Sequence, residues 1–213
     1  MKKTLPMCFV AAAAALMLTA CGGDDDTVGG NAGGGNTGSS TTDTALKDAV
    51  LNIHNTERAK HGSPDLAWDD NLAQEANTYV QSAMNAYSCN NPSAFDWNKW
   101  GWPPKVMDGT YGGNMVLTNS LTQAQSSAAL IDLANSFMNT QWLSGQPPYF
   151  DNSVVPSDPY FDGEKHHYRQ MVWSTTTHIG CAHARNQCSN SPLYMLFCYY
   201  SPAGNKPGER ALP

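Results

Sequence analysis

Residues 1–43 are not expected to form part of a packed core. The folded part of the chain is therefore a single domain formed by the residues that follow. Lys2 and Lys3 precede an apolar run over residues 7–18. That pattern is typical of a secretory signal, and the run is shorter than the about 20 residues of a membrane-spanning helix. Residues 22–42 are Gly, Asp, Asn, Ser and Thr with almost no apolar side chain, so we expect a disordered tether. We therefore divide the chain into a signal (1–20), a tether (21–43) and one domain (44–213), which is long enough for its own core.

The end of the signal reads Leu18-Thr19-Ala20-Cys21 and resembles a bacterial lipobox, in which the cysteine is acylated and becomes the new N-terminus. Two acyl chains give stable membrane anchoring where one chain is marginal. The alternative is an ordinary signal peptide cleaved after Ala20, which would release a soluble protein. We expect an exported protein that is lipid-anchored to the cell envelope through Cys21. Because Gly22 rather than Asp follows the cysteine, the outer membrane is the expected destination in a Gram-negative host.

Four cysteines remain in the domain, namely Cys89, Cys181, Cys188 and Cys198. An even number in an exported chain predicts two disulfides, and the C-x-x-C pairs of a zinc site are absent. The net charge is −6 and no basic patch occurs, which argues against a nucleic-acid partner. We assign no cofactor and expect a monomer held at the membrane by its anchor.

Periodicity predicts helices in the first part of the domain and strands in the last. One helix runs from Asp43 or Thr44 to Gly62, a second starts at Asp69 or Asp70, and Thr122-x-x-Gln125 is a capping box for a third. Strands are predicted at 167–173, 178–185 and 193–201, after a long aromatic loop between Tyr87 and Tyr111. This order predicts an α+β layered domain with a short antiparallel sheet.

Four sequence motifs resemble those of the CAP superfamily and occur in the same order as in that family, which includes cysteine-rich secretory proteins, insect venom antigens and plant class-1 pathogenesis-related proteins. The motifs are His54-Asn55-x-x-Arg58, Leu66-x-Trp68-Asp69, His167-Tyr168-Arg169-Gln170-Met171-Val172-Trp173 and Phe197-Cys198-Tyr199-Tyr200-Ser201-Pro202-Ala203-Gly204-Asn205. The resemblance implies a three-layer α-β-α sandwich, the CAP or SCP domain, over residues 44–213. It also implies a disulfide between Cys181 and Cys198, which would leave Cys89 to pair with Cys188. We interpret His54, Asn55 and Arg58 as a buried polar network that joins helix to sheet.

Many members of that family hold a divalent metal with two histidines and two acidic residues. His167 matches one of the histidines, whereas the acidic positions fall on Gly113 and near Thr140. No histidine lies between His61 and His166 to supply the second one. On a predicted strand, His166 and His167 would point to opposite faces and could not chelate one ion, although Asp162 and Glu164 lie near them in the sequence. We therefore assign no metal site.

Phe95, Trp97, Trp100 and Trp102 place four large aromatic side chains in eight residues. The spacing Phe95-x-Trp97-x4-Trp102 resembles the caveolin-binding pattern through which some fungal family members are thought to hold sterols. The alternative is that these rings cover the sheet edge and the core. Aromatic side chains in a long loop can also form an apolar pocket or a lip that faces a membrane.

The sequence contains neither a G-x-S-x-G elbow nor an H-E-x-x-H motif, and every cysteine of the domain is assigned to a disulfide. We expect a non-catalytic, envelope-anchored binding module for an apolar, lipid-like or sterol ligand, or for a partner protein. The candidate ligand-binding residues are Phe95, Trp97, Trp100, Trp102 and His167. The alternative function is a hydrolase or metal-dependent enzyme that uses His167 as its catalytic base in the cleft around it.

Overall fold

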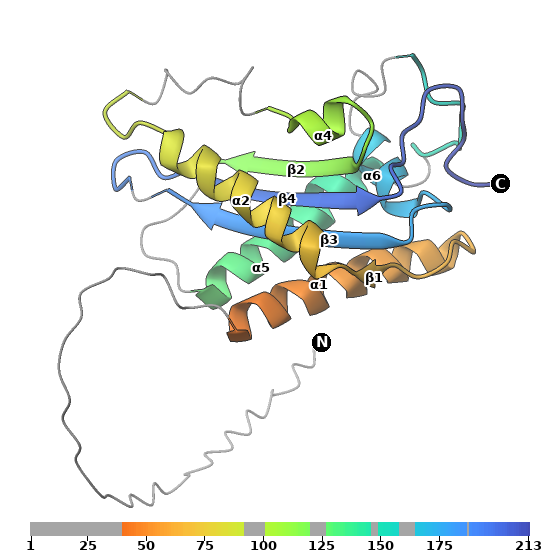
Figure 1. Ribbon diagram of the computed structural model, residues 1–213. Coiled ribbons are helices and arrows are strands. Elements are labelled where there is room, and N and C mark those ends of the chain that lie inside the picture. The colour runs from red at the N-terminus through yellow and green to blue at the C-terminus, as the bar shows by residue number, and fades with distance from the viewer. Residues whose placement is uncertain (1–39, 92–100, 120–126, 146–148, 158–164, 187) are drawn as a thin grey trace, which may run out of the picture. The chain divides into compact units, whose positions relative to one another are not determined.

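A computed structural model of the chain describes residues 40–91, 101–119, 127–145, 149–157, 165–186 and 188–213 (Figure 1). The chain divides into two units, Met1–Asn36 and Thr37–Pro213, and all described residues lie in the second. Its helices are α1 (Ser40–Lys60), α2 (Asp70–Ala86), α4 (Pro104–Met107), α5 (Ser127–Phe137), η2 (Met138–Trp142), η3 (Leu143–Gly145) and α6 (Lys165–Val172). Its strands are β1 (Ala67–Trp68), β2 (Gly112–Thr118), β3 (His178–Arg185) and β4 (Tyr194–Ser201). Among the described residues, no helix is both long and apolar enough to cross a bilayer.

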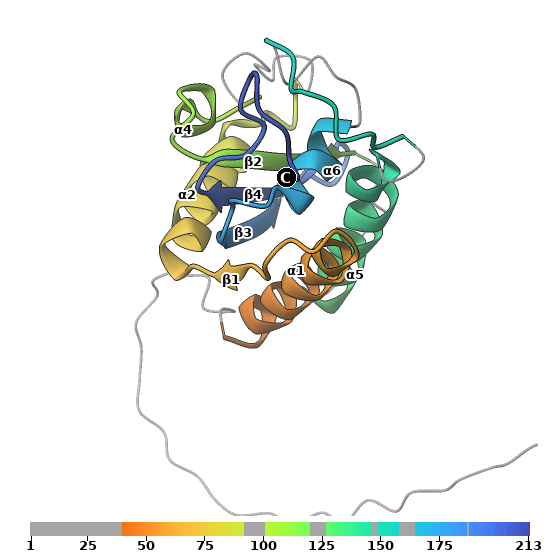
Figure 2. The same cartoon turned by 90° about the vertical axis from the view of Figure 1, so that its right-hand side faces the viewer.

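The four strands form one sheet in the order β1-β3-β4-β2. Strands β3, β4 and β2 pair antiparallel, and the two-residue β1 adds a short parallel pair beside β3. Helix α2 covers one face of the sheet, and α1 and α5 lie on the other (Figure 2). The arrangement is the predicted α-β-α sandwich.

Strand β4 is the centre of the domain because both of its faces are buried. Tyr194, Leu196, Cys198 and Tyr200 belong to the core beneath α1 and α5. The alternate residues Met195, Phe197 and Tyr199 belong to the core beneath α2. A continuous apolar run is what a strand buried on both faces requires.

Helix α2 lies very close to strand β3. Asp69 caps the helix by accepting hydrogen bonds from the backbone N–H groups of Asn71 and Leu72, as predicted. A Cβ atom added at Gly180 of β3 would meet the backbone nitrogen of Ala73 at 2.2 Å. Only glycine therefore fits at that position, and α2 is held rigidly against the sheet.

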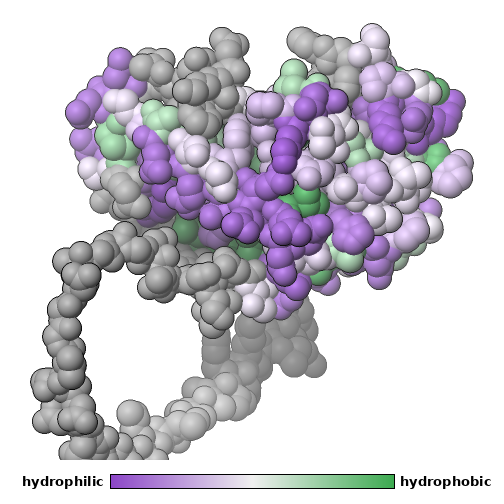
Figure 3. Space-filling model, in the orientation of Figure 1, coloured by the Kyte–Doolittle hydropathy of each residue, from purple (hydrophilic) through white to green (hydrophobic). Residues whose placement is uncertain are grey.

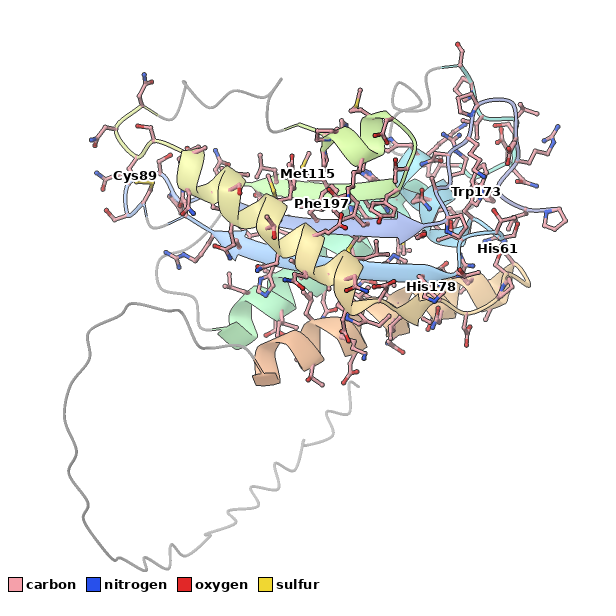
Figure 4. The ribbon with its side chains drawn as sticks, in the orientation of Figure 1. His61, Cys89, Met115, Trp173, His178 and Phe197 are labelled. Atoms are coloured by element: carbon pink, nitrogen blue, oxygen red, sulfur yellow. A yellow bond between two sulfur atoms is a disulfide. The ribbon has the colours of Figure 1, made fainter. Side chains whose placement is uncertain are left out.

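Both predicted disulfides are present. Cys181 and Cys198 face each other directly across the β3–β4 pair and are joined inside the core. The Cys89–Cys188 bond ties the chain just beyond α2 to the turn between β3 and β4. Figure 4 shows Cys89 at the opposite end of the sheet from His178.

Four sequence-based assignments were wrong, incomplete or lie outside the described residues. The segment 167–173, predicted as a strand, is largely helix α6, whose Tyr168, Met171 and Val172 are buried at helical spacing. Strand β2 was assigned to no element, and α1 begins at Ser40, before the predicted Asp43. The Thr122–Gln125 capping box lies outside the described residues.

Candidate functional site

The side chain of Trp102 packs over the first part of edge strand β2. Its half-buried ring makes edge-to-face contacts with Phe197, at 6.5 Å between ring centroids, and with His166, at 6.3 Å. A Cβ atom added at Gly113 would meet a methyl group of Val106 at 2.8 Å and the Trp102 ring at 3.1 Å. The space above Gly113 is thus filled by apolar groups, and an acidic side chain there would have to displace them.

His166 and His167 lie in the first turn of α6, with ring centroids 4.0 Å apart. On its other side the His167 ring stacks on Trp142, at 6.3 Å. The prediction that these histidines point to opposite faces was wrong because it assumed a strand. The rings form a continuous row at the sheet edge, and Val106 lies beside the first of them over Gly113. We call this group the β2-edge cluster: Trp102, Val106, Trp142, His166 and His167.

The His167 imidazole is uncharged at neutral pH. Burial, and to a smaller extent the neighbouring His166, lowers the pKa of His167 from 6.5 to about 3. A general base works best when its pKa lies near the operating pH, so a pKa of about 3 makes His167 a weak proton acceptor. The His167 end of the β2-edge cluster is therefore aromatic and uncharged.

The positions at which the resemblance implies acidic metal ligands, Gly113 and the neighbourhood of Thr140, carry no acidic side chain. Thr140 is exposed, and its hydroxyl donates to the backbone carbonyl of Ser136 at 2.8 Å. Across the described parts of the chain, no group of three or more His, Cys, Asp or Glu side chains could hold a metal ion. Asp162 and Glu164 lie outside those parts. The described residues do not fit the family's metal site.

A chain of buried hydrogen bonds runs from α1 to α6 behind the cluster. His54 Nδ1 donates to the Val50 carbonyl at 2.7 Å, and His54 Nε2 bonds the Tyr200 hydroxyl at 2.8 Å. Burial lowers the pKa of His54 to about 4, so its Nε2 is an acceptor for the Tyr200 proton. Asn114 Nδ2 donates to the Tyr200 oxygen at 3.1 Å and to the His167 carbonyl at 3.0 Å. This chain fixes the backbone of His167 against β2.

Arg58 holds the other end of α6. Its fully buried guanidinium donates to the carbonyls of Met171 and Trp173, both at 2.9 Å, and of Thr176, at 2.8 Å. Its Nε donates to a fourth carbonyl, that of Pro64, at 2.6 Å. With Asn55, which bonds both backbone groups of Leu66, these contacts agree with the predicted polar network.

Two of the five predicted ligand-binding residues lie in the cluster, Trp102 and His167. Phe95, Trp97 and Trp100 lie outside the described residues. The sequence interpretation missed Trp142 and Asn114. Asn114 directly follows Gly113 in the sequence, so its neighbourhood carried a signal, whereas Trp142 reaches His167 through tertiary packing that no local motif indicates.

Comparisons with known proteins agree on one protein family. The sequence profile described as "CAP: Cysteine-rich secretory protein family" matches residues 51–200. "Secreted protein RBT4" of Candida albicans is 30% identical over 166 residues, which are 78% of this chain and 37% of that protein. "Pathogenesis-related protein 1A" of Nicotiana tabacum is 30% identical over 159 residues, 75% of this chain and 76% of that protein. The chain spans less than half the length of the fungal relatives it matches.

Solved structures support the same fold. The structure titled "Structure of BmVAL-1" has a TM-score of 0.57 at 20% identity and covers 83% of this chain and 85% of its own. "Crystal structure of NaASP2 with Zn2+" has a TM-score of 0.56 at 18% identity, over 84% of this chain and 90% of its own. The sequence relatives come from fungi, plants and an animal, and they do not support the predicted bacterial lipid anchor.

Proposed function

The chain belongs to the cysteine-rich secretory protein (CAP) family, and from this premise we propose that its domain is a non-catalytic binding module for an apolar, lipid-like ligand. The ligand is held at the β2-edge cluster, with Trp102 as its principal contact. The observation that carries the proposal is the filling of the space above Gly113 by Trp102 and Val106. Where the family places an acidic side chain, this protein places an aromatic ring.

The neighbourhood of Trp102 supports an apolar ligand. Met107, on the short helix α4 that also carries Val106, is 64% exposed. A methionine side chain exposed on this helix is flexible and apolar, and such side chains are frequent on surfaces that bind apolar partners. The low pKa of His167 removes a positive charge that would favour an anionic headgroup. An uncharged apolar ligand therefore fits this surface best.

The non-catalytic character rests on two properties of His167. Its pKa of about 3 disfavours general base catalysis at neutral pH. No set of metal ligands accompanies it within the described residues. A hydrolase that uses His167 is the competing function, and the experiment below separates the two.

We further propose that the protein is exported and anchored to the cell envelope through acylated Cys21. Export agrees with a family described as secretory and with a relative named as a secreted protein. The polar composition of residues 22–39 favours a tether between Cys21 and the domain. An anchored domain on such a tether would have lipid available close to its binding site.

Replacing Trp102 by alanine should weaken capture of a fluorescent fatty alcohol or sterol analogue by about 10-fold to 100-fold. Full burial of one large apolar side chain is worth roughly 1.5–3 kcal/mol, and every 1.4 kcal/mol is about tenfold in affinity. Trp97→Ala, in the same aromatic stretch, should also reduce capture. The measurement is a titration of each purified variant with the same probe.

Two controls make the result interpretable. Trp68 is also half-buried but lies on β1, at the opposite edge of the sheet, so Trp68→Ala should bind normally. His167→Ala should retain most of the binding. Loss of capture in His167→Ala together with normal capture in Trp102→Ala would contradict the proposal and favour the hydrolase function.

A further inference from the structure

The two disulfides of the domain differ in their access to solvent. Cys181 and Cys198 are 3% and 0% exposed and lie inside the core. Cys89, by contrast, is exposed, although its partner Cys188 is only 2% exposed. Figure 4 labels Cys89 at one end of the domain, where Figure 3 shows hydrophilic residues at the surface. A dissolved reagent can therefore reach one of the two bonds but not the other.

The chain around Cys89 is a solvent-exposed turn. Residues 88–91 follow the end of α2, and all four are exposed. Within this turn the N–H of Asn91 donates to the carbonyl of Ser88 at 3.3 Å. Just before it, the hydroxyls of Tyr87 and Ser191 share a hydrogen bond of 2.6 Å. Because residues 88–91 bury no side chain, this turn can move without disturbing the core.

The turn that carries Cys188 is held by more than the disulfide. The buried side chain of Asn186 accepts hydrogen bonds from the N–H groups of Cys188, at 3.3 Å, and of Leu193, at 2.9 Å. Its Nδ2 donates to the carbonyl of Ser191 at 3.0 Å. Its backbone N–H donates to the carbonyl of Leu193 at 2.9 Å. Opening the disulfide would therefore release Cys89 and leave Cys188 in place.

The chemistry of exchange selects the same sulfur. A thiolate opens a disulfide by attacking one sulfur atom and expelling the other, and its rate depends on access to the atom attacked. The thiolate approaches along the S–S axis, from the side opposite to the leaving sulfur. Because Cys89 is exposed and Cys188 is buried, an attack on Cys89 comes from solvent, whereas an attack on Cys188 would come from inside the domain.

We propose that the Cys89–Cys188 bond is a thiol–disulfide exchange site that a small dithiol opens, while the Cys181–Cys198 bond stays closed. One thiolate of the dithiol attacks the sulfur of Cys89, forms a mixed disulfide with it and expels Cys188 as a thiolate. The second thiolate of the reagent then attacks the reagent's own sulfur in the mixed disulfide and releases Cys89. The dithiol supplies both electrons and ends as a cyclic disulfide, and each cysteine takes up one proton.

Reduction at this site would loosen the end of α2 while the rest of the domain stays folded. Leu72, Ala76 and Val80 keep the helix in the core. The Cys181–Cys198 bond still joins β3 to β4. A redox change at one exposed point is thereby converted into a change of mobility at one end of the domain. The proposal does not depend on the ligand assigned to the β2-edge cluster.

The test is treatment of the folded full chain with dithiothreitol, followed by alkylation with iodoacetamide and peptide mapping of the four cysteines of the domain. We expect Cys89 and Cys188 to be alkylated at least about 100-fold faster than Cys181 and Cys198, because the core bond is reached only when the domain unfolds. In concentrated urea all four should react together. The matched control is Cys89→Ser/Cys188→Ser, in which the two remaining cysteines should stay unlabelled until urea is added.

Two further measurements test the direction of attack. With glutathione and an acid quench, the mixed disulfide should map to Cys89 rather than to Cys188. After reduction without urea, amide hydrogen exchange should become faster at residues 84–91 and stay unchanged at residues 188–193. Equal rates for the two disulfides, no reduction before unfolding, or glutathione attached to Cys188 would each overturn the proposal. None of these measurements uses the apolar ligand, so they stand whatever the outcome of the binding experiments.

Discussion

Replacing Arg58 by methionine should lower the free energy of unfolding by about 3–5 kcal/mol, the largest effect that we expect from any single substitution. The change leaves four buried carbonyl oxygens without their donor, those of Pro64, Met171, Trp173 and Thr176. Unsatisfied buried groups cost about 1–3 kcal/mol each before the structure relaxes. The measurement is equilibrium unfolding in urea with both disulfides intact.

Two further variants show whether the geometry of the Arg58 guanidinium is responsible for this contribution to stability. Arg58→Lys keeps the charge but replaces the planar guanidinium and its several N–H donors by a single ammonium group. This variant should therefore recover only part of the stability. Lys105→Ala removes the partner of Glu75 in a surface ion pair and should lower stability far less than Arg58→Met does. A loss below about 1 kcal/mol for Arg58→Met would contradict the role of Arg58 in holding the end of α6.

Acidification from pH 7 to pH 5 should destabilise the domain by about 4 kcal/mol, because two histidines are neutral in the fold. Burial lowers the pKa of His54 to about 4 and that of His167 to about 3, whereas both are near 6.5 in an unfolded chain. Below pH 6.5 the unfolded state therefore binds more protons than the folded state does. Stability is complete above pH 6.5 and falls as the pH falls towards the folded pKa values.

The acid effect is measured by urea unfolding at a series of pH values. A His54→Gln variant should lose about half of the dependence between pH 7 and pH 5, even if it is less stable throughout. Asp108 and Asp151 do not contribute to the change in stability between pH 7 and pH 5, since their lowered pKa values affect stability only at more acidic pH. A flat profile between pH 7 and pH 5 would show that the two imidazoles are not buried as described.

The sequence predicts best those elements whose signals are local. Strand β3 has the bounds predicted for it, and α2 begins at its predicted cap because Asp69 precedes a helical apolar pattern. Strand β2 begins with Gly112 and Gly113, which disfavour strands, and it exists because it pairs with β4. The segment at α6 is too short for periodicity to separate helix from strand.

The candidate site was predictable only in part, because several of its contacts join residues that are distant in the sequence. Trp102 and His167 stand in recognisable patterns, but the sequence does not show that His166 and Trp142 extend them into one row of rings. Trp142 comes from η2, which precedes α6 in the chain, and it meets His167 only when η2 packs against α6. The filling of the space above Gly113 likewise depends on where α4 lies.

Native mass spectrometry of the full chain, extracted from membranes in mild detergent, tests the central claim most directly. The account predicts the mass of a chain whose first residue is acylated Cys21. It also predicts a bound lipid or sterol, which should be absent from Trp102→Ala and present in Trp68→Ala. A chain without any lipid-like ligand, or a ligand retained equally by Trp102→Ala, would contradict binding at the β2-edge cluster. A bound divalent ion in place of a lipid would instead support the metal-dependent function.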